Sequence, residues 1–163
     1  RGYKGSLHIT GDQKICFEAF DTLKDHFAGQ GIDLELLSAQ YRFADVALAR
    51  NIDPDEARAV LRDHHLPVRV LDTGFAVHIQ APGVSKETAM RKLAVDMGLS
   101  LDDMIAVGDS ENDIEMLRAA GVGVAVQNAP ELTRSAADWV SKSAYGDGFV
   151  EAVKKYYPDR FSR

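Results

Sequence analysis

Cysteine is scarce in this sequence, and long apolar runs are absent from it. Cys16 is the single cysteine among 163 residues, which excludes an intramolecular disulfide framework and fits a reducing compartment. No apolar run approaches the roughly 20 residues that a membrane helix needs, and no signal peptide is recognisable. We therefore expect a cytoplasmic protein without a membrane partner.

Basic residues are outnumbered by acidic ones. Lys and Arg total 19 against 25 Asp and Glu, which gives a net charge of −6 at pH 7. This balance argues against a nucleic-acid surface and favours solubility. A hydrophobic share of 45% and a charged share of 27% are typical of a globular protein. The length suits one ordinary domain or two small ones, and we expect no nucleic-acid partner.

Residues 1–82 have the pattern of an α+β unit. The predicted elements are a strand at 6–10, a helix at 13–28, a strand at 41–49, a helix at 54–64, and a hairpin of strands at 68–71 and 75–80. In the hairpin, Val68 and Val70 are expected on the same face as Phe75, Val77 and Ile79. The short connection makes these two strands antiparallel.

The order of elements changes after Ala81-Pro82-Gly83. Helices are predicted at 86–97, 112–120, 130–136 and 148–156, with strands at 104–107, 121–126 and 138–141 between them. The first of these helices should bury Ala89, Met90, Leu93, Ala94 and Met97. Strict alternation of helix and strand indicates a parallel, doubly wound layer.

The segment 104–113 is the most informative part of the chain. Four apolar residues predict a strand buried on both faces, Gly108 ends it, and Asp109 and Asp113 follow. Ligands bind beyond the carboxyl ends of strands in open α/β sheets, and Mg²⁺ takes oxygen ligands, usually one or two carboxylates with phosphate and water. These residues predict a Mg²⁺ site.

The same segment also fits a simple helix start. Ser110 and Asp113 have the spacing of a capping box, in which Ser110 caps a helix and Asp113 reaches back to a backbone N–H. The two interpretations are compatible, because a capped helix start can also hold a metal ligand.

Two polar residues elsewhere are candidates for binding. Lys86 stands at a predicted helix start, where a cation and free N–H groups suit an anion such as phosphate; the alternative is a solvated surface lysine. Asn128 lies just beyond a predicted strand, where it reaches the ligand edge or serves as a turn or cap residue.

Other patterns do not predict chemistry. Asp53 and Asp55 flank Pro54 like a paired-carboxylate motif, but no buried strand precedes them and a helix cap explains them better. The histidines lack the spacing of a zinc site. Residues 146–148 are predicted to form a flexible loop, and Trp139 is expected to serve packing.

Four segments resemble the C-terminal half of a haloacid dehalogenase superfamily phosphatase. They read Gly-Val-Ser-Lys at 83–86, Val-Gly-Asp-Ser-Glu-Asn-Asp at 107–113, Gly-Val-Ala-Val-Gln-Asn-Ala at 123–129 and Asp-Gly at 147–148. The resemblance is closest to the branch with a large α+β cap, and within it to archaeal phosphoglycolate phosphatases and related sugar phosphatases. It covers residues 83–150, whereas residues 6–80 match the cap in layout alone.

This resemblance implies an α/β fold, with a doubly wound parallel (Rossmann-like) core portion at 83–163 and an α+β cap domain with antiparallel strands at 1–82. It implies that Lys86 holds phosphate, that Asn128 contacts substrate, and that Asp109 and Asp113 anchor Mg²⁺ directly or through water. In such enzymes a nucleophilic Asp attacks the phosphoryl group, a second Asp acts as general acid/base, and Mg²⁺ neutralises charge.

The nucleophile motif of that family, an apolar strand ending in Asp-x-Asp-Gly-Thr, does not occur in this sequence. We expect it upstream of Arg1, so we assign no catalytic residue and expect residues 1–163 alone to be inactive. The full protein is expected to hydrolyse phosphoglycolate, a small phosphorylated metabolite. The alternatives are a sugar-phosphate phosphatase and a nucleophile-less module that binds phosphate and Mg²⁺; the sequence leaves open whether the protein is a homodimer.

Overall fold

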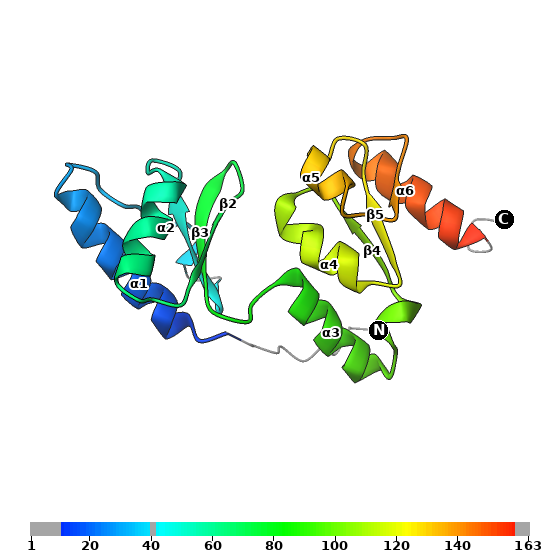
Figure 1. The fold of residues 1–163 in the computed structure, drawn as a ribbon, viewed down its shortest axis with the longest axis horizontal. Coiled ribbons are helices and arrows are strands. Elements are labelled where there is room, and N and C mark those ends of the chain that lie inside the picture. The colour runs from blue at the N-terminus through cyan, green and yellow to red at the C-terminus, as the bar shows by residue number, and fades with distance from the viewer. Residues whose placement is uncertain (1–10, 40–41, 159–163) are drawn as a thin grey trace. The chain divides into compact units, whose positions relative to one another are not determined.

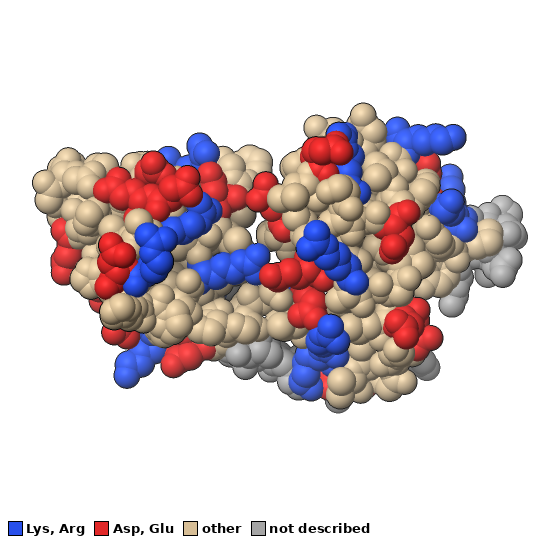
Figure 2. All heavy atoms as spheres, viewed as in Figure 1, with Lys and Arg blue, Asp and Glu red and all other residues tan. Residues whose placement is uncertain are grey.

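The computed structural model describes residues 11–39 and 42–158, and the strand predicted at 6–10 lies outside them. The described residues form two compact units, one ending at Val84 and one beginning at Ser85 (Figure 1). This division falls two residues beyond the predicted boundary. No described helix combines the length and the apolar character that a bilayer crossing requires. On the face shown in Figure 2, acidic and basic side chains are interspersed over each unit.

The first unit is an antiparallel sheet covered by two helices. Its strands β1 (Asp45–Ala49), β3 (Ala76–Gln80) and β2 (Arg69–Asp72) pair in the order β1-β3-β2. The helices are α1 (Gln13–Ala28) and α2 (Pro54–Asp63). Every second strand residue faces these helices, and together they build one core, which includes Phe20, Leu23, Phe27, Val46, Leu48, Leu61, Val70, Val77 and Ile79.

The strand predicted at 75–80 was wrong in part, because it begins one residue later, at Ala76. Phe75 is 91% exposed and does not share the buried face of Val77 and Ile79. It follows Gly74, whose φ of +80° turns the chain, so the alternation starts only at Ala76.

The strand predicted at 41–49 begins four residues later, at Asp45. Arg42, just before the bend at residues 43–44, places Nη1 2.6 Å from Asp45 Oδ2, and His78 Nδ1 lies 3.1 Å from the same oxygen. Burial alone raises the pKa of Asp45, but these partners outweigh it and hold the pKa below its usual value. The start of the strand thus depends on a side-chain contact between Asp45 and His78, which are 33 positions apart in the sequence.

Helix α2 begins and ends with recognisable caps. Asp53 Oδ1 accepts a hydrogen bond from the Asp55 backbone N–H, so the paired acids form a helix start, as predicted. At the other end the N–H of Leu66 donates to Leu61 O and that of His65 to Arg62 O. This is a Schellman motif, whose left-handed position usually holds glycine. Here His65 occupies it with a φ of +56°.

Replacing His65 with glycine should therefore stabilise the first unit. The left-handed conformation costs a residue with a Cβ about 1 kcal/mol, so His65→Gly should raise the free energy of unfolding by that amount. The measurement is urea unfolding followed by NMR signals of α2 and β2. His64→Gly is the matched control, because His64 has a φ of −84° and gains nothing from glycine. Equal effects of the two changes would contradict the prediction.

The second unit is a parallel sheet with helices between its strands, as predicted. Strands β4 (Ile105–Gly108), β5 (Val122–Ala125) and β6 (Trp139–Val140) are parallel and ordered β4-β5-β6. The helices are α3 (Lys86–Met97), α4 (Ile114–Ala119), α5 (Glu131–Arg134) and α6 (Tyr145–Tyr156), and 3₁₀ turns occupy Leu101–Asp103 and Glu111–Asp113. The carboxyl ends of all three strands therefore meet at one edge of the sheet.

Three details of this unit differ from prediction. Helix α3 buries only Met90 and Ala94 of its expected stripe, because in the described part of the chain it packs mainly on α4, and Leu93 and Met97 stay exposed. Strand β4 is an edge strand among the described residues, so Ile105 and Val107 are only partly buried, whereas Ala106 is buried. Residues 146–148 form the first turn of α6, not a flexible loop.

Candidate functional site

Glycine at the end of β4 lets the chain fold back on itself. A Cβ on Gly108 would lie 2.4 Å from Asp113 Cβ, well inside the contact distance. Without that Cβ, Asp113 packs directly against the strand end, and its carboxylate reaches the backbone of the turn. The sequence Gly-Asp-Ser-Glu-Asn-Asp therefore brings Asp109 and Asp113 to the same edge of the sheet.

The Asp113 carboxylate is fully engaged. Its Oδ2 accepts hydrogen bonds from the backbone N–H of Asp109 at 3.0 Å and of Ser110 at 3.1 Å, and Ser110 Oγ lies 3.0 Å away. Its Oδ1 lies 2.5 Å from Lys86 Nζ. The hydrogen bond from the Ser110 N–H to the Asp113 carboxylate is the carboxylate half of the predicted capping box. The same carboxylate therefore both stabilises the turn and anchors the Lys86 side chain.

The electrostatics of Asp113 follow from these partners. Burial by itself raises the pKa of Asp113, since it disfavours the charged form. The Lys86 ammonium and the two backbone N–H groups outweigh burial and hold the pKa below its usual value. Asp113 is therefore a carboxylate at neutral pH and has no proton to donate.

Lys86 is the first residue of α3, and Ser85 caps that helix by accepting from the Thr88 N–H. The Lys86 side chain is 49% exposed, while that of Asp113 is only 3% exposed. The ammonium is thus anchored on one side and open on the other. A lysine held in this way can bind an anion without losing its buried partner.

Asp109 is exposed, and within the part of the chain that the structure describes its carboxylate has no hydrogen-bond or ion-pair partner. A free carboxylate beside a saturated one fits Mg²⁺, which binds through one or two carboxylates plus phosphate and water. Among the described residues no group of three or more His, Cys, Asp or Glu side chains could enclose a metal.

A cavity of about 410 Å³ joins these groups. Its lining comes from the ends of β4 and β5 and from the starts of α3 and α6: Lys86, Val107, Gly108, Asp109, Asp113, Val126, Tyr145, Gly146 and Phe149. Three of the four predicted site residues, Lys86, Asp109 and Asp113, meet in it. We call this set the Lys86–Asp113 site.

Asn128, the fourth predicted residue, lies beside the lining rather than in it. Its Oδ1 accepts a hydrogen bond of 2.7 Å from the Tyr145 N–H, the first residue of α6. Asn128 therefore positions a segment that lines the cavity. Its contact with substrate stays a prediction.

Sequence reasoning missed Tyr145, Gly146 and Phe149. Tyr145 has a φ of +50°, a conformation that non-glycine residues rarely adopt and that often occurs at functional sites. The signal available in the sequence was the position of this segment, which follows β6 closely. In a parallel sheet, the segments that follow neighbouring strands all lie at the same edge of the sheet.

Comparison with known families settles the relationship of this chain. A family model described as haloacid dehalogenase-like hydrolase matches residues 40–153. The chain belongs to that family. The match spans parts of both units, and the predicted fold class, a parallel α/β layer with an antiparallel α+β unit, is confirmed.

The proteins that are similar to this chain include some that are named as phosphatases. A phosphoglycolate phosphatase of Methanoculleus marisnigri is 73% identical over 163 residues, which are 100% of this chain and 70% of the relative. A crystal structure from Thermoplasma acidophilum matches with a TM-score of 0.68 at 22% identity, over 95% of this chain and 64% of that one, and shows the fold alone. A subclass IIB sugar phosphatase of the superfamily matches with a TM-score of 0.61 at 27% identity, over 72% of this chain and 44% of that one.

Proposed function

We propose that this chain belongs to a Mg²⁺-dependent phosphomonoester hydrolase that converts 2-phosphoglycolate and water to glycolate and phosphate. The observation that supports it best is the Lys86–Asp113 site. It joins a half-exposed ammonium, 2.5 Å from a buried carboxylate, to the free carboxylate of Asp109 in one cavity. The name of the relative that is 73% identical supports the choice of substrate.

The phosphate group would bind at Lys86. The ammonium supplies a fixed positive charge, and the N-terminus of the 12-residue helix α3 adds the positive end of its dipole. Because Asp113 holds the ammonium before substrate arrives, little reorganisation is needed when charge develops on the transferring phosphoryl group. Lys86 thus acts as an electrostatic clamp.

Asp109 would be the direct Mg²⁺ ligand, because its carboxylate is the free one. Asp113 would act through a bound water or by orienting the turn, since both of its oxygens already accept hydrogen bonds. Bound Mg²⁺ would neutralise charge on the phosphoryl oxygens.

We also propose that Asn128 contributes to the site by positioning Tyr145, through the hydrogen bond from the Tyr145 N–H. The protein is proposed to act in the cytoplasm on a small metabolite.

A sugar phosphate is the second candidate substrate, supported by the 27% identity to a sugar phosphatase. Both substrates share the phosphate monoester that the Lys86–Asp113 site would bind. They differ in the group that leaves.

A chimera tests the proposal and separates the two substrates. The 163 residues replace their aligned counterpart in the M. marisnigri relative, which supplies the rest of that protein. We expect Mg²⁺-dependent release of phosphate from 2-phosphoglycolate, with kcat/KM within about tenfold of the parent, since closely related residues replace each other. Released phosphate is measured colorimetrically, with glucose 6-phosphate in parallel.

Two outcomes would each favour one of the alternatives. A preference for glucose 6-phosphate would favour the sugar phosphatase. A folded chimera that binds phosphate and Mg²⁺ but hydrolyses neither substrate would favour the binding module. Residues 1–163 alone serve as the control and should release no phosphate. Hydrolysis by this control would show that the nucleophile lies within this sequence.

A further inference from the structure

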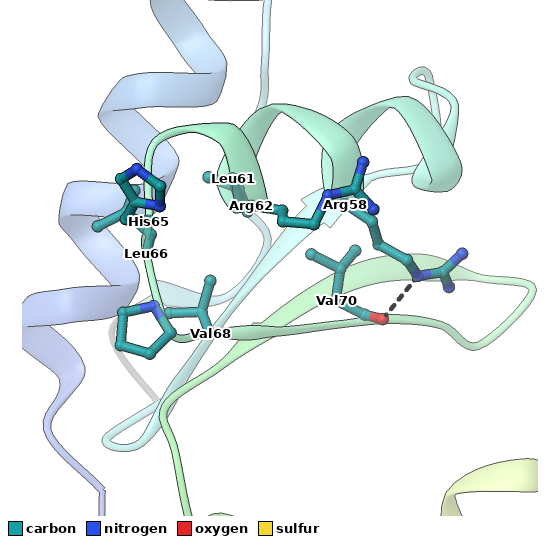
Figure 3. A pocket seen from close by; sticks show the side chains of 8 residues that line it. Arg58, Leu61, Arg62, His65, Leu66, Val68 and Val70 are labelled. Carbon is teal, nitrogen blue, oxygen red and sulfur yellow. Dashed lines mark hydrogen bonds between the residues drawn. The ribbon is translucent and has the colours of Figure 1, made fainter.

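A second cavity, of about 420 Å³, lies in the first unit between α2 and β2 (Figure 3). We call it the α2 pocket, and its lining consists of Arg58, Leu61, Arg62, His65, Leu66, Pro67, Val68 and Val70. It shares no lining residue with the Lys86–Asp113 site. Its volume lies in the range of about 300–1,000 Å³ that small-molecule sites occupy.

The floor of the α2 pocket is apolar and preformed. Leu61 and Val70 are buried members of the core of the first unit, and Leu66 and Val68 pack against that core. Packing within this core fixes the positions of these residues. Contact with this floor would remove an apolar group of a ligand from water, which favours binding.

The rim of the pocket is basic. Arg58 and Arg62 lie one helical turn apart on α2, and Figure 3 shows the Arg58 side chain reaching towards β2 and the Arg62 side chain running along α2. Arg58 is committed: its Nε donates to Val70 O at 3.2 Å, and its Nη1 pairs with Asp55. The guanidinium of Arg62 is available to a ligand, because the side chain is 76% exposed and its only described carboxylate neighbour, Asp63, lies 3.9 Å from Nε. None of the described lining residues is acidic.

His65 completes the rim in a strained conformation. Its φ of +56° occupies a position where glycine would be favoured, yet an imidazole stands there at the edge of an apolar floor. Local strain of this kind tends to be kept where the side chain has a task.

We propose that the α2 pocket, whose lining lies entirely in the first unit, binds a small organic carboxylate with an apolar body. The floor accepts the body, and the guanidinium of Arg62 matches a planar carboxylate through two parallel N–H···O bonds. A carboxylate fits better than a phosphate dianion, because Asp55 already neutralises Arg58 and leaves one guanidinium charge to satisfy.

Titration of the full 163-residue chain with phenylacetate tests this proposal. Backbone amide shifts in a ¹⁵N–¹H spectrum locate the binding. We expect saturable shifts at Leu66, Val68 and Val70 with a dissociation constant of roughly 1 mM, which is usual for so small a probe. Phenylacetamide, the uncharged analogue, should bind at least about fivefold more weakly. Equal binding of the two probes, or no saturable shift, would overturn the proposal.

Variants separate binding from folding. Arg62→Gln should weaken phenylacetate about fivefold, and Arg91→Gln, an exposed arginine on α3, should change nothing. His65→Gly should weaken the probe while making the unit more stable, which loss of structure could not produce. Unchanged affinity in Arg62→Gln would refute the assigned role of that guanidinium.

Discussion

Replacing Asp109 with asparagine in the chimera should reduce kcat for 2-phosphoglycolate by roughly 10²–10³-fold, the usual cost of losing one preorganised electrostatic group. The physical reason is that only one of the two carboxylates at this site is free to bind a metal ion. Both oxygens of Asp113 accept hydrogen bonds, from Lys86 and from the turn amides, whereas the Asp109 carboxylate is exposed and has no described partner. Asparagine keeps the size of the side chain but removes the charge that binds Mg²⁺ strongly. The Mg²⁺ concentration for half-maximal rate should rise in the same variant.

Two measurements make the Asp109 test specific. Asp102→Asn removes an exposed carboxylate from the same unit, outside the cavity, and should leave both kcat and the Mg²⁺ dependence unchanged. Unfolding followed by Trp139 fluorescence should show little change for Asp109→Asn, because its carboxylate holds no other described residue. Retained turnover with an unchanged Mg²⁺ requirement would remove Asp109 from the metal site.

Much of the fold and part of the site could be predicted from sequence because their signals are local. Helices α1 and α3 have the predicted bounds, since apolar spacing and the flanking Asp12, Ser85, Gly29 and Gly98 specify them within a few residues. The pair Asp109 and Asp113 was found for the same reason: a strand, a glycine and a helix start follow one another.

The remaining features depend on contacts distant in the sequence. Nothing near Lys86 indicates that its ammonium contacts a carboxylate 27 positions away, or that Asn128 caps a helix 17 positions away. Phe75 and Leu93 fit an apolar pattern and are exposed nevertheless, because the turn at Gly74 and the narrow contact between α3 and α4 decide burial. Periodicity predicts which residues share a face, not whether anything covers that face.

Asp113→Ala should destabilise the second unit by about 3 kcal/mol, because it leaves the donors of Asp109, Ser110 and Lys86 without their common acceptor. Lys86→Met should cost only about 1 kcal/mol, since the ammonium is half exposed and the remaining donors still hold the carboxylate. Urea unfolding followed by fluorescence of Trp139, the single tryptophan, reports this unit.

A double-mutant cycle isolates the Lys86–Asp113 interaction. The combined variant should lose less than the sum of the two single losses, because the second change has no partner left to disturb. Glu131→Ala breaks an exposed pair with Arg134 in the same unit and serves as the control, with no measurable effect expected. Strict additivity would mean that the 2.5 Å contact contributes nothing to stability.

The stabilisation by Asp113 should also depend on pH in one direction. Its folded-state pKa lies below the unfolded value of about 3.9, so the stabilisation is complete above that pH and is lost as the pH falls through the lower, folded-state pKa. The difference in unfolding free energy between the wild type and Asp113→Asn should therefore be constant from about pH 7 to 5 and shrink below about pH 4. A difference that grows on acidification would require a raised pKa, and Asp113 would then be an acid poised to donate a proton rather than the fixed anion that holds Lys86.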